Sequence, residues 1–593
     1  MSIAKKIADW RYRHLSEYNF VLMMSVVVGL ASGLAAVLLK TVVHLGNRLL
    51  LSHTLPVSTG GNALMIIYPG IGIVLTVLFV KYVVKGSIGH GIPEVLLSIS
   101  RKQGQLPPRN MWSSMVASTI TVAFGGSVGL EAPIASTGSA IGSNIGRAMG
   151  LQPRYVKLLL GCGAAGAIAG IFKAPIAGLL FVVEVLMFDF TKTSAIPLLI
   201  STLTAATVAY FLMGTDVQFA FAVTSGFELS QIPFYILLGV FCAGSSIYFL
   251  RMTDSVERFF KHRKNIWAKA GIGALSLGLM VYLFPPLFGE GYGGLMQLME
   301  GHGSMLTENC VVENWTESPW AGLVFLLALI LLKAIATATT IGSGGVGGTF
   351  GPSLVVGGLS GYFIALLCNQ LGMPTQSTAN FALVGMAAVM TGVMHAPLMG
   401  TFLIAEITGG YALMIPLLIT SAVTYLVVNP FEKYSIYAHK LALHGDLLTH
   451  DKDSSAWQLI NMRNLIETNF VVVREGDKLR DLVEAIKSSR RNVFPVLSAD
   501  DKFVGAIHLD DVRKIMFSPE KYDVFHVEQL MHPISEGDIV RITDSPESVV
   551  AKFEVSNRYN LIVIDTDETY LGILSRANTF SAYRKFVKEE SAE

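Results

Sequence analysis

The chain has 593 residues, of which 52% are hydrophobic and only 15% are charged, whereas soluble domains carry about 25% charged residues. Its mean hydropathy of +0.53 excludes an ordinary water-soluble globule. The formal net charge of +1 provides no broad basic or acidic field, so we expect no nucleic-acid partner.

The first seventeen residues combine basic and apolar side chains. Lys5 and Arg11 alternate with Ile7 and Trp10, a mixture that is typical of an amphipathic helix on a membrane surface. We therefore predict such a helix over residues 1–17, with a frayed polar tail as the alternative. In both cases the basic residues favour a cytoplasmic amino terminus, because positive charge is usually retained on that side of a membrane.

Apolar segments recur through the next four hundred or so residues, but several are too short and others too long for one straight span of about 20 residues. They cover approximately residues 19–51, 63–84, 111–124, 155–189, 194–213, 232–251, 267–287, 319–338, 353–371, 379–407 and 411–429. Glycine-rich breaks at residues 125–129 and 342–348 would leave backbone amides unpaired in lipid. We therefore expect these breaks to be buried in protein or to line a hydrated path.

An internal duplication relates two parts of this apolar region. Gly163, Gly170, Pro175, Gly178 and Glu184 reappear at a constant spacing as Gly385, Gly392, Pro397, Gly400 and Glu406, and Gly129, Pro133 and Gly138 reappear as Gly348, Pro352 and Gly357. We therefore predict a polytopic membrane domain over residues 18–444, with related halves at about 18–215 and 229–444. In such duplications, discontinuous helices from both halves often meet at the substrate site.

Three short motifs place glycine and proline where a helix should begin. They read Gly89-His90-Gly91-Ile92-Pro93, Gly129-Leu130-Glu131-Ala132-Pro133 and Gly348-Thr349-Phe350-Gly351-Pro352. A helix amino terminus carries unpaired amides and about half a positive charge, so several termini at one place would bind an anion and still release it. Glycines that serve only close helix packing are the alternative.

These motifs resemble the three signatures of the CLC family of chloride channels and proton-coupled chloride antiporters, GSGIP, G(K/R)EGP and GxFxP. The resemblance covers about residues 18–445 and includes the duplication and the pair Tyr434-Ser435. It implies a mostly α-helical membrane protein with the CLC fold of two inverted helical repeats. It also implies chloride as the permeant ion, no required cofactor, and a homodimer with one pore per subunit.

The resemblance also implies roles for individual residues. Glu131 matches the gating glutamate, whose carboxylate competes with the anion for the same helix-terminal amides. Tyr434 matches the tyrosine whose hydroxyl completes the central anion site, although the nearby Tyr437 could be mistaken for it. The plainer alternatives are a helix cap for Glu131 and an interfacial aromatic for Tyr434. The implied anion-binding set is His90, Gly91, Ile92, Gly129, Leu130, Thr349, Phe350, Gly351 and Tyr434.

Two residues depart from the family pattern in ways that bear on the mechanism. His90 stands where the family usually has serine, which leaves the preferred anion open between chloride, other halides and nitrate. Val185 stands where the antiporters have an inner glutamate that supplies protons, and valine cannot carry a proton. We therefore predict a passive chloride channel gated by Glu131. A chloride/proton antiporter with an unusual inner proton path is the alternative.

Charged residues concentrate at the carboxyl end, where residues 451–593 hold about half of all Asp, Glu, Lys and Arg. This shift in composition predicts a linker over 445–462 and a soluble domain over 463–593. Within the soluble domain, a pattern of strand, helix, two strands and helix occurs twice, with Asn492 aligned to Asn560.

This second repeat resembles a pair of CBS domains, at about residues 463–518 and 524–588, a cytoplasmic α/β module that often binds adenine nucleotides. Its nucleotide motif has the form G-x-x-S/T-x-x-D, and each copy here retains half of it. Asp511 in the first copy and Ser575 in the second are the candidate nucleotide-binding residues. An ordinary helix cap is the alternative for Asp511.

CBS domains also follow magnesium channels and some intramembrane metalloproteases. A protease of that kind needs the string His-Glu-x-x-His, which the sequence lacks, and a magnesium channel needs clustered carboxylates. The acids of the apolar segments, chiefly Glu131, Glu184 and Glu406, are dispersed instead. We therefore expect no enzyme and no metal site. We expect an integral protein of the cell membrane, inner or plasma, with a cytoplasmic amino terminus and cytoplasmic CBS domains.

Overall fold

A computed structural model describes residues 16–51, 63–86, 91–214, 227–300, 319–374, 376–442, 462–532, 536–556 and 558–582. The chain divides into two compact units, which meet in the sequence between Leu447 and Leu448. The first unit is helical, and the second contains two small sheets. Apart from their last one or two residues, the predicted helix over residues 1–17 and the predicted linker over 445–462 lie outside the described residues.

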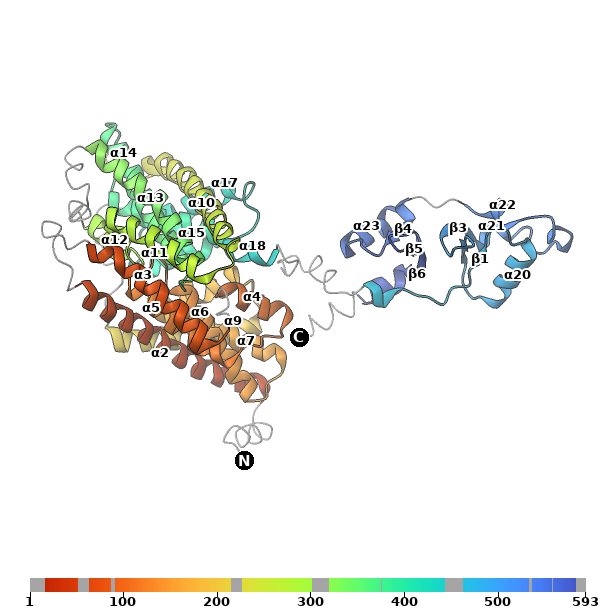
Figure 1. Cartoon of the computed structure of the whole chain (residues 1–593), viewed down its shortest axis with the longest axis horizontal. Coiled ribbons are helices and arrows are strands. Elements are labelled where there is room, and N and C mark those ends of the chain that lie inside the picture. Colours follow the sequence, from red (N-terminus) through yellow and green to blue (C-terminus); the bar gives the residue numbers. More distant parts are fainter. Residues whose placement is uncertain are drawn as a thin grey trace, which may run out of the picture. The chain divides into compact units, whose positions relative to one another are not determined.

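The first half of the membrane unit is coloured red to yellow in Figure 1. Its helices are α2 (Glu17–Leu51), α3 (Ala63–Leu78), α4 (Ile92–Arg101), α5 (Ser113–Ala123), α6 (Glu131–Ala148), α7 (Pro153–Phe172), α8 (Pro175–Leu180) and α9 (Lys192–Met213). Two π-helical turns, η2 (Phe79–Val84) and η4 (Phe181–Val185), continue α3 and α8.

The second half is coloured yellow to cyan in the same view. Its helices are α10 (Ile232–Lys261), α11 (Ile266–Leu283), α12 (Tyr292–Met299), α13 (Pro319–Gly342), α14 (Phe350–Gln370), α15 (Thr378–Met394), α16 (Pro397–Ile407), α17 (Met414–Val428) and α18 (Ile436–Ala442). Within the described residues, eight helical segments of the chain are long and apolar enough to cross a membrane. The mostly helical membrane fold expected from the sequence is therefore confirmed.

The same break interrupts both halves at the same point of the repeat. The apolar segments predicted at 155–189 and 379–407 are not continuous helices, because α7 and α15 end immediately before Lys173 and His395, which are their C-cap residues. Both residues adopt left-handed backbone conformations, with φ of 58° and 56°. A proline follows two positions later in each case and begins the next helix, since proline cannot continue the previous one but suits a first turn.

Close approach of glycines holds each pair of neighbouring helices together. Gly138 of α6 lies against the backbone of Gly163 in α7, and Gly357 of α14 lies against Gly385 in α15. A side chain on any of these glycines would collide with the partner's backbone oxygen. Small residues permit such tight packing where lipid provides no hydrophobic driving force.

Two half-buried acids join the halves reciprocally. The carboxylate of Glu184 accepts hydrogen bonds from the amides of Leu398 (3.1 Å) and Met399 (2.7 Å), at the start of α16. The carboxylate of Glu406 accepts from Ile176 (3.0 Å) and Ala177 (2.8 Å), at the start of α8. Each half therefore supplies the acid that caps a helix of the other half.

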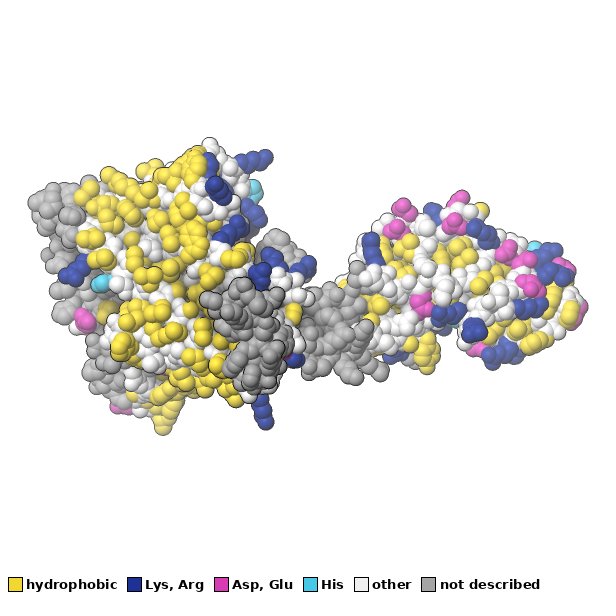
Figure 2. Space-filling view, turned by 90° about the horizontal axis from the view of Figure 1, so that it is seen from below, with side chains coloured by type: hydrophobic (Ala, Val, Ile, Leu, Met, Phe, Trp, Pro, Cys, Tyr) yellow, Lys and Arg dark blue, Asp and Glu magenta, His cyan; other side chains and the backbone are white. Residues whose placement is uncertain are grey.

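The outer surface of the membrane unit is apolar. Along α2, Leu30, Leu34, Leu38 and Leu45 expose between 46% and 55% of their surface. Their spacing places them on one side of the helix. Figure 2 shows hydrophobic side chains over most of the visible face of this unit. Such a surface is suited to contact with lipid rather than with water.

The soluble unit contains two sheets of the same topology. Their strands are β1 (Val473–Arg474), β2 (Val493–Leu497), β3 (Phe503–His508), β4 (Ile539–Arg541), β5 (Asn560–Ile564) and β6 (Tyr570–Ser575). The orders are β1-β2-β3 and β4-β5-β6, and in each sheet the first pair is parallel and the second antiparallel. The helices packed with them are α20 (Leu479–Ser488), α21 (Leu509–Val512), α22 (Val527–Leu530) and α23 (Pro546–Ser556).

The strand register corrects the alignment of the two copies by one residue. Val496 pairs with Gly505 in the first sheet, and Val563 pairs with Gly572 in the second. Val493 is therefore the counterpart of Asn560, whereas the sequence comparison aligned Asn492 with it. The sequence alignment failed because a run of similar apolar residues can shift by one position without losing its pattern.

Candidate anion-binding site

The starts of α6 and α14 are bound to each other at the glycine-rich breaks. Gly129 and Gly348 each donate an amide hydrogen bond to the other's carbonyl, at 2.8 Å in both directions. The threonines of the preceding helices bind the same breaks, since Thr340 accepts from the Ser127 amide (3.2 Å) and Thr121 accepts from the Val346 amide (3.0 Å). The first break is therefore buried, the second is partly buried, and the amides named here are satisfied within the protein.

The start of α4 lies beside this junction. Gly91 has a φ of 69°, and a side chain on it would contact Ala132 at 3.6 Å. Ala132 also lies against Gly348, so the three predicted helix starts meet around one residue of α6. Ile92, the first residue of α4, is buried. His90 lies outside the described residues, and its predicted role stays a prediction.

Glu131 lies between the starts of α6 and α14. Its side chain is only 1% exposed, and its Oε2 accepts a hydrogen bond from the Gly351 amide at 3.2 Å. Its Oε1 accepts from the Tyr292 hydroxyl at 2.8 Å. The carboxylate thus extends from the start of α6 to the start of α14, and it occupies an amide that could otherwise bind an anion.

Several of the predicted anion-binding amides already have acceptors in this arrangement. The Gly129 amide is used by Gly348, and the Gly351 amide by Glu131. The Leu130 amide donates to the Glu290 carboxylate at 3.3 Å. Gly129 therefore joins the two halves through its backbone, whereas Leu130 and Gly351 bind negatively charged groups.

The structure distinguishes the two candidate tyrosines. Tyr437, in the first turn of α18, is buried, and its phenol lies near the hydroxyl of Thr349 and the carboxylate of Glu131. Neither the Tyr437 hydroxyl nor the Thr349 hydroxyl completes a hydrogen bond within the described residues. Tyr434 lies before α18 and is half-buried against the core. Two buried, unsatisfied hydroxyls beside the helix junction are the donors that an anion needs.

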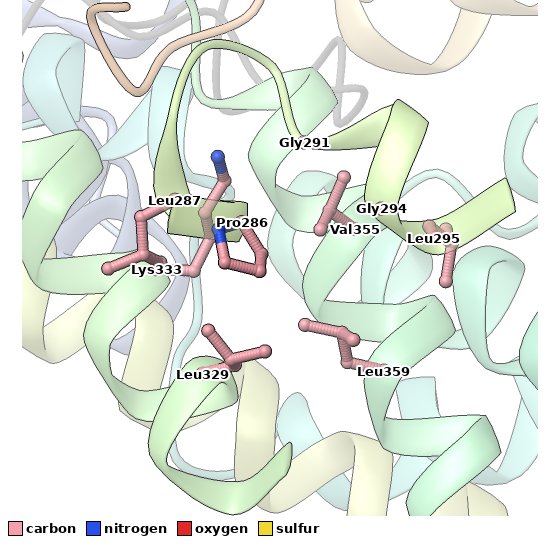
Figure 3. A pocket seen from close by; sticks show the side chains of 9 residues that line it. All are labelled: Pro286, Leu287, Gly291, Gly294, Leu295, Leu329, Lys333, Val355 and Leu359. Atoms are coloured by element: carbon pink, nitrogen blue, oxygen red, sulfur yellow. The ribbon is translucent and has the colours of Figure 1, made fainter. Parts of the chain in front are cut away.

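Sequence reasoning missed three polar residues of this region, Glu290, Tyr292 and Lys333. Lys333 of α13 is fully buried and donates to Ser127 Oγ and to the Gly289 carbonyl, both at 2.9 Å. Figure 3 shows its amino group beneath the loop that runs from Leu287 to Gly291, beside a small cavity. A lysine inside the apolar segment 319–338 was the available signal, because buried charges in membrane helices mark functional regions.

A family model described as voltage gated chloride channel matches residues 71–429, which is more than half of the chain. The chain belongs to this family. A CBS domain model matches residues 462–518, the first of the two copies in the soluble unit. The resemblance to CLC proteins and to CBS domains is thereby confirmed, and membership of a family of ion channels and transporters agrees with the expectation that the chain is not an enzyme.

Individual CLC proteins are similar along most of their length. A chloride channel protein described as ClcB-like, from Ralstonia nicotianae, is 29% identical over 394 residues, which cover 64% of this chain and 86% of that protein. The H(+)/Cl(-) exchange transporter ClcA of Vibrio cholerae is 27% identical over 445 residues, which cover 71% and 89% respectively. The similar proteins therefore include one whose name refers to a chloride channel and one named as an exchanger.

Solved structures of CLC proteins share the fold. A CLC-type fluoride/proton antiporter is 25% identical, with a TM-score of 0.57, and the match covers 71% of this chain and 97% of that one. A eukaryotic CLC transporter, 18% identical with a TM-score of 0.62, covers 95% of this chain and 99% of its own length. The second match extends over the soluble unit and shows the common fold alone.

Val185 bears on whether this CLC protein moves protons. It ends the π-helical turn η4 and is buried in the apolar core. The preceding Glu184 is directed to the amides of α16 and is used there as a helix cap. The position that the sequence predicts to match the inner glutamate of CLC antiporters is therefore a buried valine, and the acidic residue before it caps a helix.

The nucleotide candidates of the CBS pair act as helix caps. Asp511 accepts a hydrogen bond from the His508 amide at 3.2 Å and lies 3.4 Å from Nε2 of His532. Ser575 Oγ accepts from the Asn578 amide at 3.4 Å. Both side chains therefore already have partners within the soluble unit. Among the described residues, no group of three or more His, Cys, Asp or Glu is placed to hold a metal ion.

Proposed function

We propose that this CLC-family anion transport protein is a passive chloride channel in which the Glu131 carboxylate is the gate. The observation that supports it most directly is the hydrogen bond from the Gly351 amide to Glu131 at 3.2 Å. A carboxylate and a chloride ion both satisfy an amide at a helix start, so they compete for it. When Glu131 is protonated or displaced, the amide becomes available to the anion.

The anion site of this proposal is formed by partial charges. Its donors are the helix starts at Gly91 and Ile92, at Leu130, and at Thr349, Phe350 and Gly351, with His90 preceding the first of them. We assign the completing hydroxyl to Tyr437 instead of Tyr434, because Tyr437 is the tyrosine whose phenol lies near Thr349 and Glu131. Hydrogen-bond donors without a full charge bind an ion weakly enough for conduction.

Passive conduction is favoured over exchange by Val185, since a buried valine cannot relay a proton from the inner side. The alternative is a chloride/proton antiporter with a different proton path. The similarity of this chain to the ClcA exchanger is the reason to test for proton transport.

The proposal also includes the assembly and location of the protein. We propose a homodimer in the cell membrane, with one pore per subunit and with the amino terminus and the CBS pair on the cytoplasmic side.

An adenine nucleotide at the CBS pair is a further part of the proposal. Its ribose would be bound by Asp511, which would have to exchange its contacts with His508 and His532 for the ribose hydroxyls. Titration of the full-length protein with labelled ATP tests this point. Saturable binding that Asp511→Ala abolishes supports it, and the absence of saturable binding contradicts it.

Flux measurements on purified protein in chloride-loaded vesicles test the channel. We expect chloride efflux with no accompanying proton uptake. We also expect Glu131→Gln to increase flux and to remove its pH dependence, because the amide side chain imitates the protonated gate. Proton movement against its gradient, driven by chloride, would establish the antiporter instead. Unchanged flux and unchanged pH dependence in Glu131→Gln would refute the gate.

A further inference from the structure

The chain at the start of α12, residues 289–292, binds the glycine-rich break before α6 and the start of α6 at successive points. The Gly289 amide donates to the Gly125 carbonyl at 3.3 Å. The Glu290 carboxylate accepts from the Leu130 amide at 3.3 Å, and the Tyr292 hydroxyl donates to Glu131 at 2.8 Å. A second acid is therefore fixed to the residue that immediately precedes the gate, and a phenol from the same segment is fixed to the gate itself.

Glu290 lies within electrostatic range of the gate and of two lysines, the half-buried Lys40 of α2 and the buried Lys333 of α13. Lys40 Nζ is anchored on the Ile171 carbonyl at 3.2 Å, and Lys333 is anchored on Ser127 and Gly289. The charged and titratable groups that face the two acids are thus Lys40, Tyr292, Lys333 and Tyr437.

Two carboxylates that lie this close inside the protein cannot both be ionised as easily as one alone, because each negative charge disfavours the other. Their protonation is then a property of the pair. A charge on Glu290 makes a proton on Glu131 more favourable. In the proposed gate, protonation of Glu131 releases its hydrogen bond with the Gly351 amide.

We propose that Glu290 is the positioning acid of the gate, whose negative charge sets the pH at which Glu131 is protonated and releases the anion site. This inference rests on the proposed gating role of Glu131. The plainer role for Glu290 is to satisfy the Leu130 amide, and that role needs an acceptor oxygen but no charge. The two roles are separable, since glutamine keeps the acceptor and removes the charge.

The test compares chloride flux from vesicles across pH 4.5 to 8 for the full-length protein and Glu290→Gln. We expect the pH of half-maximal flux to fall by about one unit in the variant, because Glu131 loses the negative neighbour that favours its protonation. Glu300→Gln, at the exposed end of α12, is the matched control and should keep the original midpoint. Glu290→Asp, which retains the charge, should stay close to it as well.

A double variant identifies the group on which Glu290 acts. The pH profile of Glu131→Gln with Glu290→Gln should equal that of Glu131→Gln alone, because the titrating Glu131 carboxylate is absent from both. Glu290→Ser provides a second removal of charge in case the glutamine variant does not assemble, and the same downward shift is expected. An unchanged midpoint in a folded charge-removing variant would overturn the proposal, as would a shift that persists without Glu131. A pH-independent wild type would instead refute the gate itself.

Discussion

In the proposed gate, the Glu131 carboxylate accepts an amide hydrogen bond that an anion would otherwise accept. The side chain is held by an amide and a phenol, two donors that carry no full charge. Because neither donor forms an ion pair with it, protonation costs only hydrogen bonds, which are worth about 1 to 3 kcal/mol each when they involve a charged group. Such a gate can open without the rupture of a buried salt bridge.

The assignment of Tyr437 leads to a direct comparison of two tyrosines. Tyr437→Phe should weaken apparent chloride affinity about threefold to tenfold, because one donor worth about 1 kcal/mol is removed from the anion site. The matched control, Tyr434→Phe, should change affinity little. Chloride titration calorimetry on the purified variants measures both. A larger loss of chloride affinity in Tyr434→Phe than in Tyr437→Phe would show that Tyr434 supplies the hydroxyl of the anion site.

Glu131 as the proposed gate and Val185 as the proposed inner position could be predicted from motifs, whereas the choice between the two tyrosines could not. Glu131 and Val185 stand at fixed distances from glycines and prolines, which the backbone itself requires. Tyr434 and Tyr437 differ only in their place relative to the start of α18 at Ile436. Helix boundaries are uncertain by one or two residues in any sequence-based analysis, and that uncertainty spans both tyrosines.

At the scale of the elements, the apolar segments predicted the helices but not all of their ends. The segment at 155–189 contains α7, α8 and η4, and its break at Lys173 depends on a left-handed residue followed by a proline. Composition alone does not show this break, because apolar residues continue through it. Glu290 was missed for a related reason: it lies between helices, and only the folded chain brings it to Leu130.

The reciprocal caps predict a defined loss of stability. Glu406→Gln should lower the free energy of unfolding by about 2 kcal/mol, because the side-chain NH₂ cannot accept from one of the two amides that now bind the carboxylate. Glu184→Gln should behave alike by symmetry. Thermal unfolding in detergent measures both variants against the wild type. Wild-type stability in both capping variants would contradict the role of these acids.

His508 gives the soluble unit a pH-dependent stability. Burial, with the nearby Arg558 guanidinium as the next cause, lowers the pKa of His508 below its ordinary value of 6.5. Below about pH 6.5 the unfolded chain therefore binds a proton that the folded unit resists, and stability falls as the pH decreases. Calorimetry of the full-length protein between pH 7.5 and 5.5 should show this in the transition of the soluble unit.

A variant with asparagine at this position isolates the contribution of the imidazole. His508→Asn keeps a side chain suited to the residue before α21 but does not titrate, so the decrease at acid pH should become smaller. An equally steep decrease in the variant would assign the pH dependence to other groups of the unit.

For the molecule as a whole, every described residue of the candidate anion site belongs to the unit that ends at Leu447. A chain that stops there should retain chloride flux and its dependence on Glu131, because no pore residue is removed. Flux from vesicles containing the truncated protein checks this, with full-length protein as the reference. A folded but inactive truncated protein would show that the CBS pair is required for conduction.

The exchange of caps between the halves also constrains how the protein is made. Helix α8 is synthesised more than two hundred residues before Glu406, so its first amides must wait for the later half to leave the ribosome. Until then the early half carries an incomplete helix start within the bilayer. Biogenesis of this chain should consequently finish in a concerted step, in which both halves mature together and neither is a stable product alone.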